Sequence, residues 1–366
     1  MKRAVYYLML IVFSLLGLGL ITLGSVTETQ GFTYINKQLI WILLGTLAAT
    51  GVALFDYKYF KPLAPILAVV MLGLLVGVLF TEGIKGSRRW FSFGPVSFQP
   101  SELAKLIVVI LLAGWLSHIK RRASELRYGF IYPLIGLGIV AFLLMKEPDF
   151  GTTLLVCTVG GILLYVGGSN LKYLTITAVL GMVVFSFFVM TNPNRAERVV
   201  AWISPAMHED GKAYQSDQSK NAFHAGGLWG QGYGQSMQKN GFVPEDHTDF
   251  IMSIMAEELG LLASLAVVSL FLGFFFCGLT ISCACNNHFG RLLGIGVTMI
   301  ICVQAAVNIG VVTGLLPTSG IALPFFSYGG SHILVSGAMV GVLISIARHA
   351  DEPTDFQDAL ERNAAW

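Results

Sequence analysis

Long stretches without a charged residue constrain this chain more than any other feature of its sequence. A helix needs about 20 apolar residues to cross a bilayer, and such stretches recur almost from end to end. The uncharged runs cover residues 4–27, 38–55, 62–81, 106–119, 128–145, 150–171, 173–194, 259–290 and 292–347. This pattern predicts a polytopic membrane protein and argues against a water-soluble one.

Two of these runs need a different interpretation from the rest. The run 292–347 is too long for one helix, and the glycines and prolines between Gly314 and Gly330 are residues that end helices. We therefore expect two helices there, joined by an uncharged loop. The short run 106–119 extends back to Ser101. The prediction is an all-α polytopic membrane protein with ten transmembrane helices.

Composition supports this class and excludes others. Hydrophobic residues make up 55% of the 366 residues and charged residues only 12%, about half the share in soluble domains. A net charge of +2 gives no reason to expect a nucleic-acid partner. The five cysteines lie within or beside apolar runs, so they indicate neither a disulfide framework nor a zinc site.

Lysine and arginine in the short loops predict the orientation, because cytoplasmic loops carry an excess of them. A cytoplasmic N-terminus places eleven inside: Lys2, Arg3, Lys58, Lys61, Lys120, Arg121, Arg122, Arg127, Lys172, Arg291 and Arg348. It places five outside: Lys37, Lys85, Arg88, Arg89 and Lys146. Both termini are therefore expected in the cytoplasm.

We expect one transmembrane domain over residues 1–350, followed by a short acidic cytoplasmic tail, 351–366. The large hydrophilic segment at about 192–250 is then an extracytoplasmic loop. Loops of this length are usually functional or disordered. The aromatic residues within this one disfavour disorder.

The first polar group near the outer face combines Arg88 and Arg89 with the stretch from Gln99 to Lys105. Pro100 suits the first turn of a helix, and Glu102 shares a helix face with Lys105. One interpretation is a helix start with a local ion pair. The other is a cationic wall that binds an anionic phosphate group. Local sequence leaves both open.

The other two groups are acidic. Asp149 follows Pro148 in what reads as an ordinary turn. The segment Pro244 to Phe250 holds three acids and His247 at the start of a transmembrane helix. Within it Asp249 is either a helix cap or a partly desolvated general base. Glu257 lies about 12 Å further along that helix, and we expect a cation such as Lys105 to pair with it.

Five motifs follow one another along the chain. They are Gly86–Trp90 with Gln99–Lys105, Pro148–Thr152, Gly230–Gly234, Pro244–Phe250 with Glu257–Gly260, and Gly314–Pro317 with Pro324–Ser331. Over roughly residues 10–348 these motifs resemble those of the SEDS family of membrane proteins (shape, elongation, division and sporulation). Within the family the resemblance is closer to the division type than to the elongation type. The departures are Glu147, where glutamine is usual, His332, where a second serine is usual, and the additional acid Asp246.

This resemblance implies a peptidoglycan glycosyltransferase that polymerises lipid II, a disaccharide peptide on undecaprenyl pyrophosphate, outside the cytoplasmic membrane at the division septum. It implies a class B penicillin-binding transpeptidase and other division proteins as partners. Asp249 carries over as the catalytic residue. The expected substrate-binding residues are Arg88, Arg89, Glu102, Lys105, Asp149, Glu245, His247, Glu257 and Ser327.

We expect no dedicated metal site, since a lone histidine among carboxylates rarely forms one. A divalent cation, Mg²⁺ or Mn²⁺, bridging carboxylates and the substrate pyrophosphate stays open. So do two other functions, a lipid II flippase and a non-catalytic scaffold of the division machinery. A flippase also needs cations inside the membrane, whereas a scaffold has no need of the outer acidic cluster.

Overall fold

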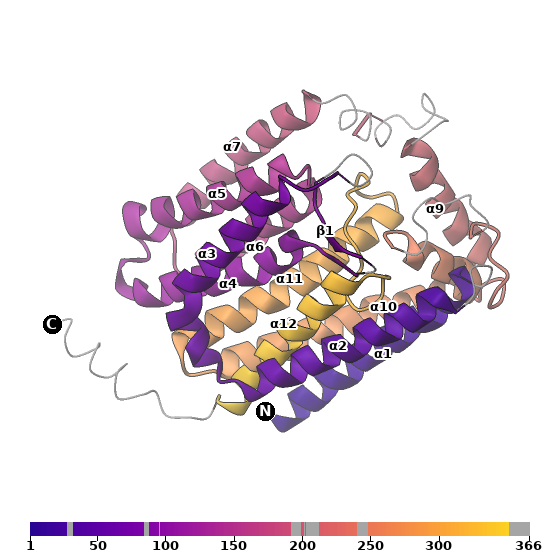
Figure 1. Ribbon diagram of the computed structural model, residues 1–366, viewed down its shortest axis with the longest axis horizontal. Helices are drawn as coiled ribbons and strands as arrows, with labels where there is room; N and C mark the ends of the chain where they lie inside the picture. The colour runs from indigo at the N-terminus through magenta and orange to yellow at the C-terminus, as the bar shows by residue number, and fades with distance from the viewer. Residues whose placement is uncertain are drawn as a thin grey trace.

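A bundle of long helices forms the body of the protein (Figure 1). The computed structural model describes residues 1–27, 32–83, 88–94, 96–191, 199–200, 202, 212–239 and 248–350. In these ranges the long apolar helices are α1 (Lys2–Val26), α2 (Thr33–Leu54), α3 (Phe60–Val78), α4 (Pro100–His118), α5 (Tyr132–Lys146), α6 (Phe150–Val166), α7 (Leu171–Met190), α10 (Ile251–Ala284), α11 (His288–Val312) and α12 (Gly330–Arg348).

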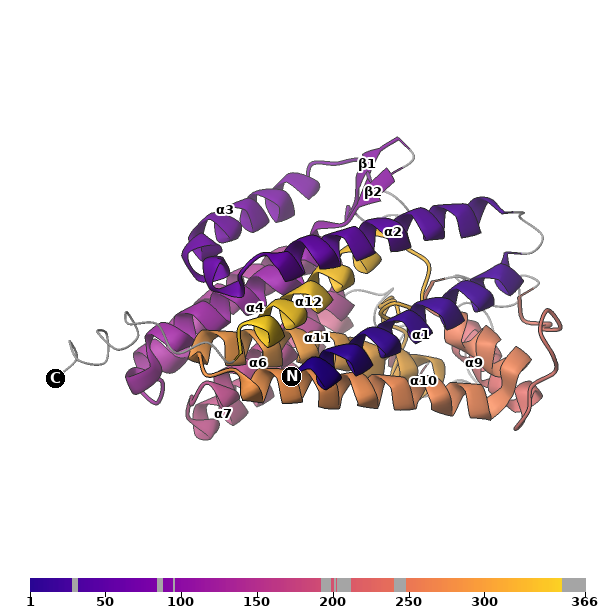
Figure 2. The ribbon, with the colours of Figure 1, turned by 90° about the horizontal axis from the view of Figure 1, so that it is seen from below.

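Smaller elements connect these helices. A polar helix, α9 (Lys212–Gly226), precedes α10. The short turns are η2 (Tyr57–Tyr59), η3 (Lys120–Arg122) and η4 (Leu126–Ile131). Strands β1 (Phe91–Phe93) and β2 (Val96–Phe98) form an antiparallel hairpin between α3 and α4, with Ser92 opposite Ser97. Figure 2 shows this hairpin beyond the end of α3.

The described helices have the lengths and composition of a multi-pass membrane protein. Eight are long and apolar enough to cross a membrane, and α6 and α7 supply two shorter apolar helices at the other two predicted positions. Large apolar side chains on the outer helices face outwards, and Val69 is 71% exposed. Exposed apolar surface on this scale indicates contact with lipid.

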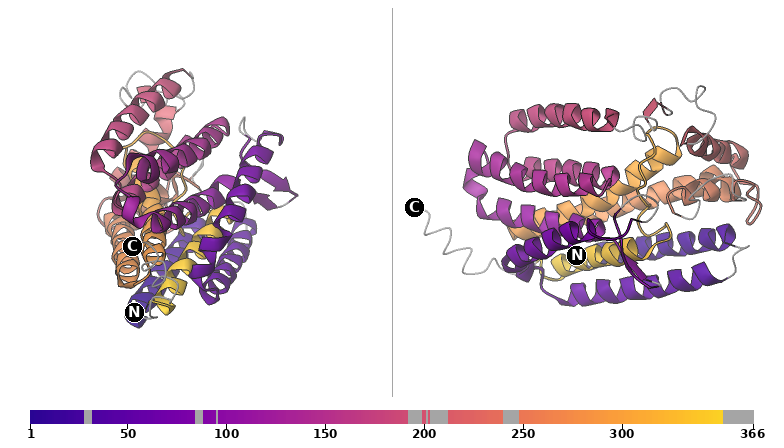
Figure 3. Two further views of the ribbon diagram at one scale, coloured as in Figure 1. Left: turned by 90° about the vertical axis from the view of Figure 1, so that its left-hand side faces the viewer. Right: turned by 45° about the horizontal axis from the view of Figure 1, so that its top comes forward.

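Helices α4, α11 and α12 form the buried centre of the bundle. In the end-on view of Figure 3 the yellow α12 lies between darker and orange helices. Glycines allow it to approach α2 closely, because a Cβ at Gly337 or Gly341 would overlap the carbonyl oxygen of Gly45 or Ala49. Small residues four apart are a common solution for helices that pack within lipid.

The predicted division of the run 292–347 is confirmed. Helix α11 ends at Val312, α12 begins at Gly330, and an irregular loop folds back between them. Helix α4 begins at Pro100 with Glu102 in its first turn, as expected. Helix α10 begins at Ile251, directly after the acidic segment where the start of a transmembrane helix was expected, and so extends the uncharged run 259–290 towards its N-terminus.

A break at Gly260 divides α10 into two segments. Gly260 has φ 78° and ψ −175°, so nine residues form a separate first segment of the helix. The loop after α9 replaces the missing helical hydrogen bonds. Gln231 donates its backbone N–H to the carbonyl of Glu257 (2.9 Å), and Leu261 donates to the carbonyl of Gly227 (2.9 Å). Only glycine fits here, since a Cβ at Gly260 would come within 2.5 Å of the Leu228 carbonyl oxygen.

Candidate active site

Asp249 lies in the turn that leads into α10, and its backbone is fixed from two sides. The Asn308 side-chain amide donates to the carbonyl of Asp249 (2.9 Å) and to that of Ile321 (2.8 Å). The Ser327 hydroxyl donates to the carbonyl of Thr248 (2.6 Å). These bonds join the turn to α11 and to the loop before α12. The backbone of Asp249 is therefore held independently of its carboxylate.

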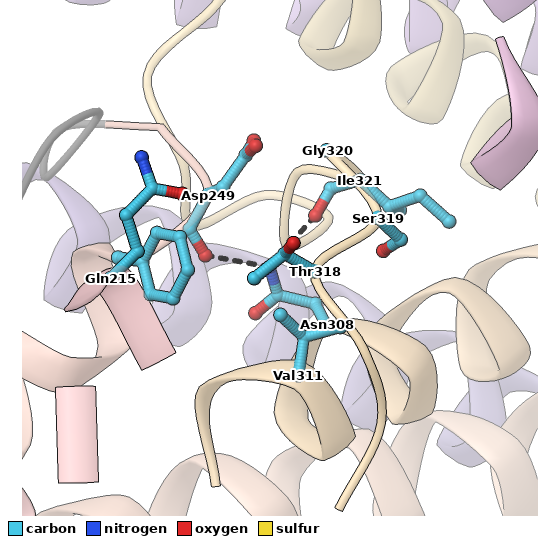
Figure 4. A pocket seen from close by; sticks show the side chains of 9 residues that line it. Gln215, Asp249, Asn308, Val311, Thr318, Ser319, Gly320 and Ile321 are labelled. Atoms are coloured by element: carbon cyan, nitrogen blue, oxygen red, sulfur yellow. Dashed lines mark hydrogen bonds between the residues drawn. The ribbon is translucent and has the colours of Figure 1, made fainter. Parts of the chain in front are cut away.

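A polar pocket of about 220 Å³ adjoins Asp249 (Figure 4). Gly320 keeps the space beside the carboxylate open. It has φ 73°, and a Cβ at this position would lie 3.7 Å from the Asp249 Oδ2 atom. The pocket is lined by Gln215, Asp249, Phe250, Asn308, Val311, Thr318, Ser319, Gly320 and Ile321.

The ion pair of Glu102 and Lys105, one of the two interpretations that the sequence leaves open, is present in the structure. Lys105 Nζ lies 2.7 Å from Glu102 Oε2, and both residues are buried. The same ammonium donates to Gln304 Oε1 (2.7 Å). A buried pair is tolerated only where further hydrogen bonds satisfy its remaining donors and acceptors. Gln304 supplies one of them from α11.

The ion pair and Asp249 are linked through one loop. Gln304 also donates to the carbonyl of Ala322 (2.9 Å), next to the Ile321 carbonyl that Asn308 holds. Gln304 and Asn308 are four residues apart on α11 and share a helix face. One face of α11 therefore positions both charged groups relative to the same loop.

The two arginines are anchored to backbone carbonyls. Arg88 is exposed, and its Nη1 atom donates to the carbonyl of Leu79 (3.0 Å). Arg89 donates from Nε to the carbonyl of Glu147 (3.0 Å) and from Nη2 to that of Pro148. These contacts place Arg88 at the end of α3 and Arg89 at the connection between α5 and α6. The phosphate-binding role of both stays a prediction.

Asp149 is a buried residue that caps the start of α6. Its carboxylate accepts from the backbone N–H of Thr152 (3.2 Å), the first turn of α6. It also accepts from Gln99 Nε2 (3.2 Å) and Ser101 Oγ (3.0 Å) at the start of α4. Its described contacts tie two helix starts together, and its predicted substrate contact stays a prediction.

Glu147 beside it is the more unusual carboxyl group. It is fully buried, and among the described residues neither carboxylate oxygen has a hydrogen-bond partner. Burial and then the charge of Asp149 raise the pKa of Glu147 to about 8, while the charge of Arg89 acts in the opposite direction. At neutral pH this side chain is protonated.

The expected pairing of Glu257 with Lys105 is wrong. The Glu257 carboxylate instead accepts from Ser236 Oγ and from the backbone N–H groups of Met237 (3.1 Å) and Gln238 (3.3 Å). The break at Gly260 brings this loop against the first segment of α10. Glu257 therefore anchors a loop, and its predicted role in binding substrate stays a prediction.

The neighbouring Glu258 anchors the same loop to α1. Its Oε1 atom accepts from Ser25 Oγ (2.5 Å) and lies 3.8 Å from Lys239 Nζ. Two further candidates, Glu245 and His247, lie outside the described residues. Within the described ranges no three acidic, histidine or cysteine side chains converge on a possible metal position. Cation binding by the acidic segment before Asp249 stays an expectation.

Gln304, Asn308 and Gln215 are the residues that sequence reasoning missed. The candidates predicted from the sequence are mostly charged side chains, whereas these three are uncharged. A usable signal was present for two of them. Gln304 and Asn308 stand four apart inside an apolar run, where polar side chains are costly unless they have a structural or functional role.

Comparison with known proteins agrees with the resemblance in sequence. Residues 3–352 match the family model FTSW_RODA_SPOVE, described as cell cycle protein. The chain is 34% identical over 350 residues to a probable peptidoglycan glycosyltransferase FtsW of Trichlorobacter lovleyi, covering 93% of this chain and 92% of the relative. It is 34% identical over 355 residues to stage V sporulation protein E of Bacillus subtilis, covering 94% and 96%.

Solved structures share the fold. One of them is a chain in a solved structure described as "Structural coordination of polymerization and crosslinking by a peptidoglycan synthase complex". Its chain matches with a TM-score of 0.79 at 27% identity, covering 95% of this chain and 98% of that one. The rod shape determining protein RodA of Thermus thermophilus matches with a TM-score of 0.73 at 26% identity, covering 94% and 97%. This chain is therefore a multi-pass membrane protein that belongs to the FtsW/RodA/SpoVE family.

Proposed function

We propose that this protein is a peptidoglycan glycosyltransferase that polymerises lipid II into β-1,4 glycan strands for the septal cell wall. Several relatives carry the name peptidoglycan glycosyltransferase. The observation that carries the proposal is the Asp249 pocket: a carboxylate on a fixed backbone, beside polar side chains and next to a bundle of apolar helices. A substrate with a sugar head and a polyprenyl tail suits that combination.

In the proposed reaction Asp249 is the general base. It removes the proton from the 4-hydroxyl of the acceptor sugar as that oxygen attacks the anomeric carbon of the donor. The bond between this carbon and the pyrophosphate oxygen breaks, and the lipid pyrophosphate leaves with the electron pair. Direct displacement inverts an α-linked donor into a β linkage. A base positioned in this way typically contributes about 10² to 10⁴ in rate.

The cations have the complementary role. Negative charge develops on the departing pyrophosphate, and preorganised cations stabilise such charge in the transition state. Lys105 is the strongest candidate, because its ion pair connects through Gln304 to the loop beside Asp249. We propose the same role for Arg88 and Arg89, which lie in the connection that follows α3.

The setting follows from the same relatives. We propose a class B penicillin-binding transpeptidase as partner, since a similar chain belongs to a complex that coordinates polymerization with crosslinking. Relatives named for FtsW and for sporulation favour cell division over elongation. The positive charge of the short loops supports cytoplasmic termini and an extracytoplasmic segment around 192–250. We also propose a single transmembrane domain over 1–350.

Polymerisation in detergent tests the proposal against the flippase and scaffold alternatives. Purified protein is incubated with lipid II, with and without the transpeptidase, and products are separated by gel electrophoresis. Only an enzyme makes glycan here, because micelles have no second leaflet to which lipid II can be moved. Glycan chains are the expected result, and unchanged lipid II under both conditions would contradict the proposal.

A further inference from the structure

A glutamine side chain lines the Asp249 pocket. Gln215 lies on α9, is half-buried, and lines the pocket with Asp249. Its amide makes no hydrogen bond to the described part of the chain. Figure 4 shows the amide group extending beside Asp249. A half-buried amide without a partner among the described residues is available to a ligand.

Helix α9 is nevertheless held firmly at this level. The hydroxyl of Ser219, fully buried, lies 2.6 Å from the Ser253 hydroxyl of α10. The Ser219 hydroxyl also lies within hydrogen-bond distance, 2.6 Å, of the carbonyl oxygen of Val312 at the end of α11. This buried contact joins three segments that are far apart in sequence.

The buried contact aligns the residues that line the pocket. Ser219, Ser253 and Val312 each stand four positions, about one helical turn, after a pocket residue. The pocket residues so placed are Gln215, Asp249 and Asn308. The Gln215 amide and the Asp249 carboxylate are therefore held on one level by the same buried contact.

The chemistry of the pocket favours a sugar over a lipid tail. A glutamine amide offers two donors and one acceptor, which match a pair of neighbouring hydroxyl groups. The volume of about 220 Å³ equals roughly seven water molecules at about 30 Å³ each. This space admits the polar edge of one sugar ring in exchange for water.

We propose that Gln215 binds the acceptor sugar, through hydroxyl groups next to the one that Asp249 deprotonates. This inference rests on the proposed glycosyltransferase function. Gln215 would orient the nucleophilic oxygen towards the donor while Asp249 takes its proton. It is a substrate-binding residue that the charged motifs of the sequence do not reveal.

Gln215→Met tests the assignment, because it keeps the length of the side chain and removes the amide. Since the amide has no described protein partner, the melting temperature should stay unchanged. The kcat/KM for lipid II should fall roughly 10- to 100-fold, since hydroxyl groups lose a matched partner. The control is Gln218→Met on the same helix, whose amide accepts from Asn221 and does not line the pocket. It should polymerise like wild type.

Two further measurements separate contact from an indirect effect. An acceptor analogue that lacks a hydroxyl next to the reacting one should slow wild type, and Gln215→Met should lose little more with this analogue than with intact acceptor. Gln215→Glu should move the acid limb of the pH–rate profile to higher pH, since a second carboxylate beside Asp249 opposes its ionisation.

The outcomes distinguish the two proposals. An active wild type with wild-type kcat/KM in Gln215→Met would overturn the role of Gln215 and leave the glycosyltransferase function standing. The role of Gln215 would also be overturned if Gln215→Met and the missing hydroxyl lowered kcat/KM independently, so that their effects multiplied for every analogue. A wild type that makes no glycan would overturn both.

Discussion

Glu147→Gln removes the one described carboxyl group that is both fully buried and unpartnered. Glu147 lies between α5 and α6, and its pKa is raised from 4.5 to about 8, mainly by burial. Below about pH 4.5 it is protonated in both the folded and the unfolded chain. As pH rises towards 8 only the unfolded chain loses the proton. Stability therefore falls with rising pH across this window and levels off above it.

The magnitude follows from the same interval. At about 1.4 kcal/mol per pH unit, the interval from 4.5 to about 8 corresponds to roughly 5 kcal/mol, of which roughly 3 kcal/mol is present at pH 7. Glutamine has similar shape and no titration. The substitution should therefore recover a large part of this free energy at neutral and alkaline pH, reduced by any cost of burying its amide.

Thermal unfolding of the purified protein in detergent, measured from pH 5 to pH 9, checks this prediction. The melting temperature of wild type should fall with pH more steeply than that of Glu147→Gln, and the two should approach each other at pH 5. The matched control is Glu125→Gln, at an exposed glutamate, which should follow wild type. Parallel curves for wild type and Glu147→Gln would refute the reasoning.

Two other substitutions have defined outcomes. Lys105→Met leaves the buried Glu102 carboxylate without its cation and should cost about 3–5 kcal/mol of stability. The Glu102→Gln/Lys105→Met double variant should recover most of that stability and still polymerise poorly; normal rates at limiting lipid II would exclude phosphate binding by Lys105. Gly260→Ala forces a left-handed φ and a clash with the loop after α9, so unfolding should become easier by about 1–3 kcal/mol. Gly136→Ala, where a Cβ meets open space, should be neutral in the same melting assay, and equal melting temperatures for the two variants would contradict the account.

Features set by local sequence were predictable. Uncharged runs located the apolar helices, and glycine and proline located the division between α11 and α12. The ion pair of Glu102 and Lys105 followed from a spacing of three residues on a helix that starts at Pro100. In each case the partners are close in the chain.

Contacts between distant segments were not predictable. Glu257 accepts from a loop about twenty residues upstream, because Gly260 breaks the helix and admits that loop. No spacing rule connects Gln215 with Asp249, since their alignment depends on Ser219 meeting α10 and α11. Local pattern could name Asp249 as a candidate but could not supply the side chains around it.

The rate of lipid II polymerisation by Asp249→Asn, relative to wild type, tests the central claim most directly. Asparagine keeps the size of the side chain and removes the base, so the rate should fall by a factor of about 10² to 10⁴. The free energy of unfolding should stay within about 1 kcal/mol of the wild-type value. The control is Asp56→Asn, at a capping aspartate that accepts from Lys58 at the start of η2, which should retain its rate. Near-normal polymerisation by a folded Asp249→Asn protein would contradict the account.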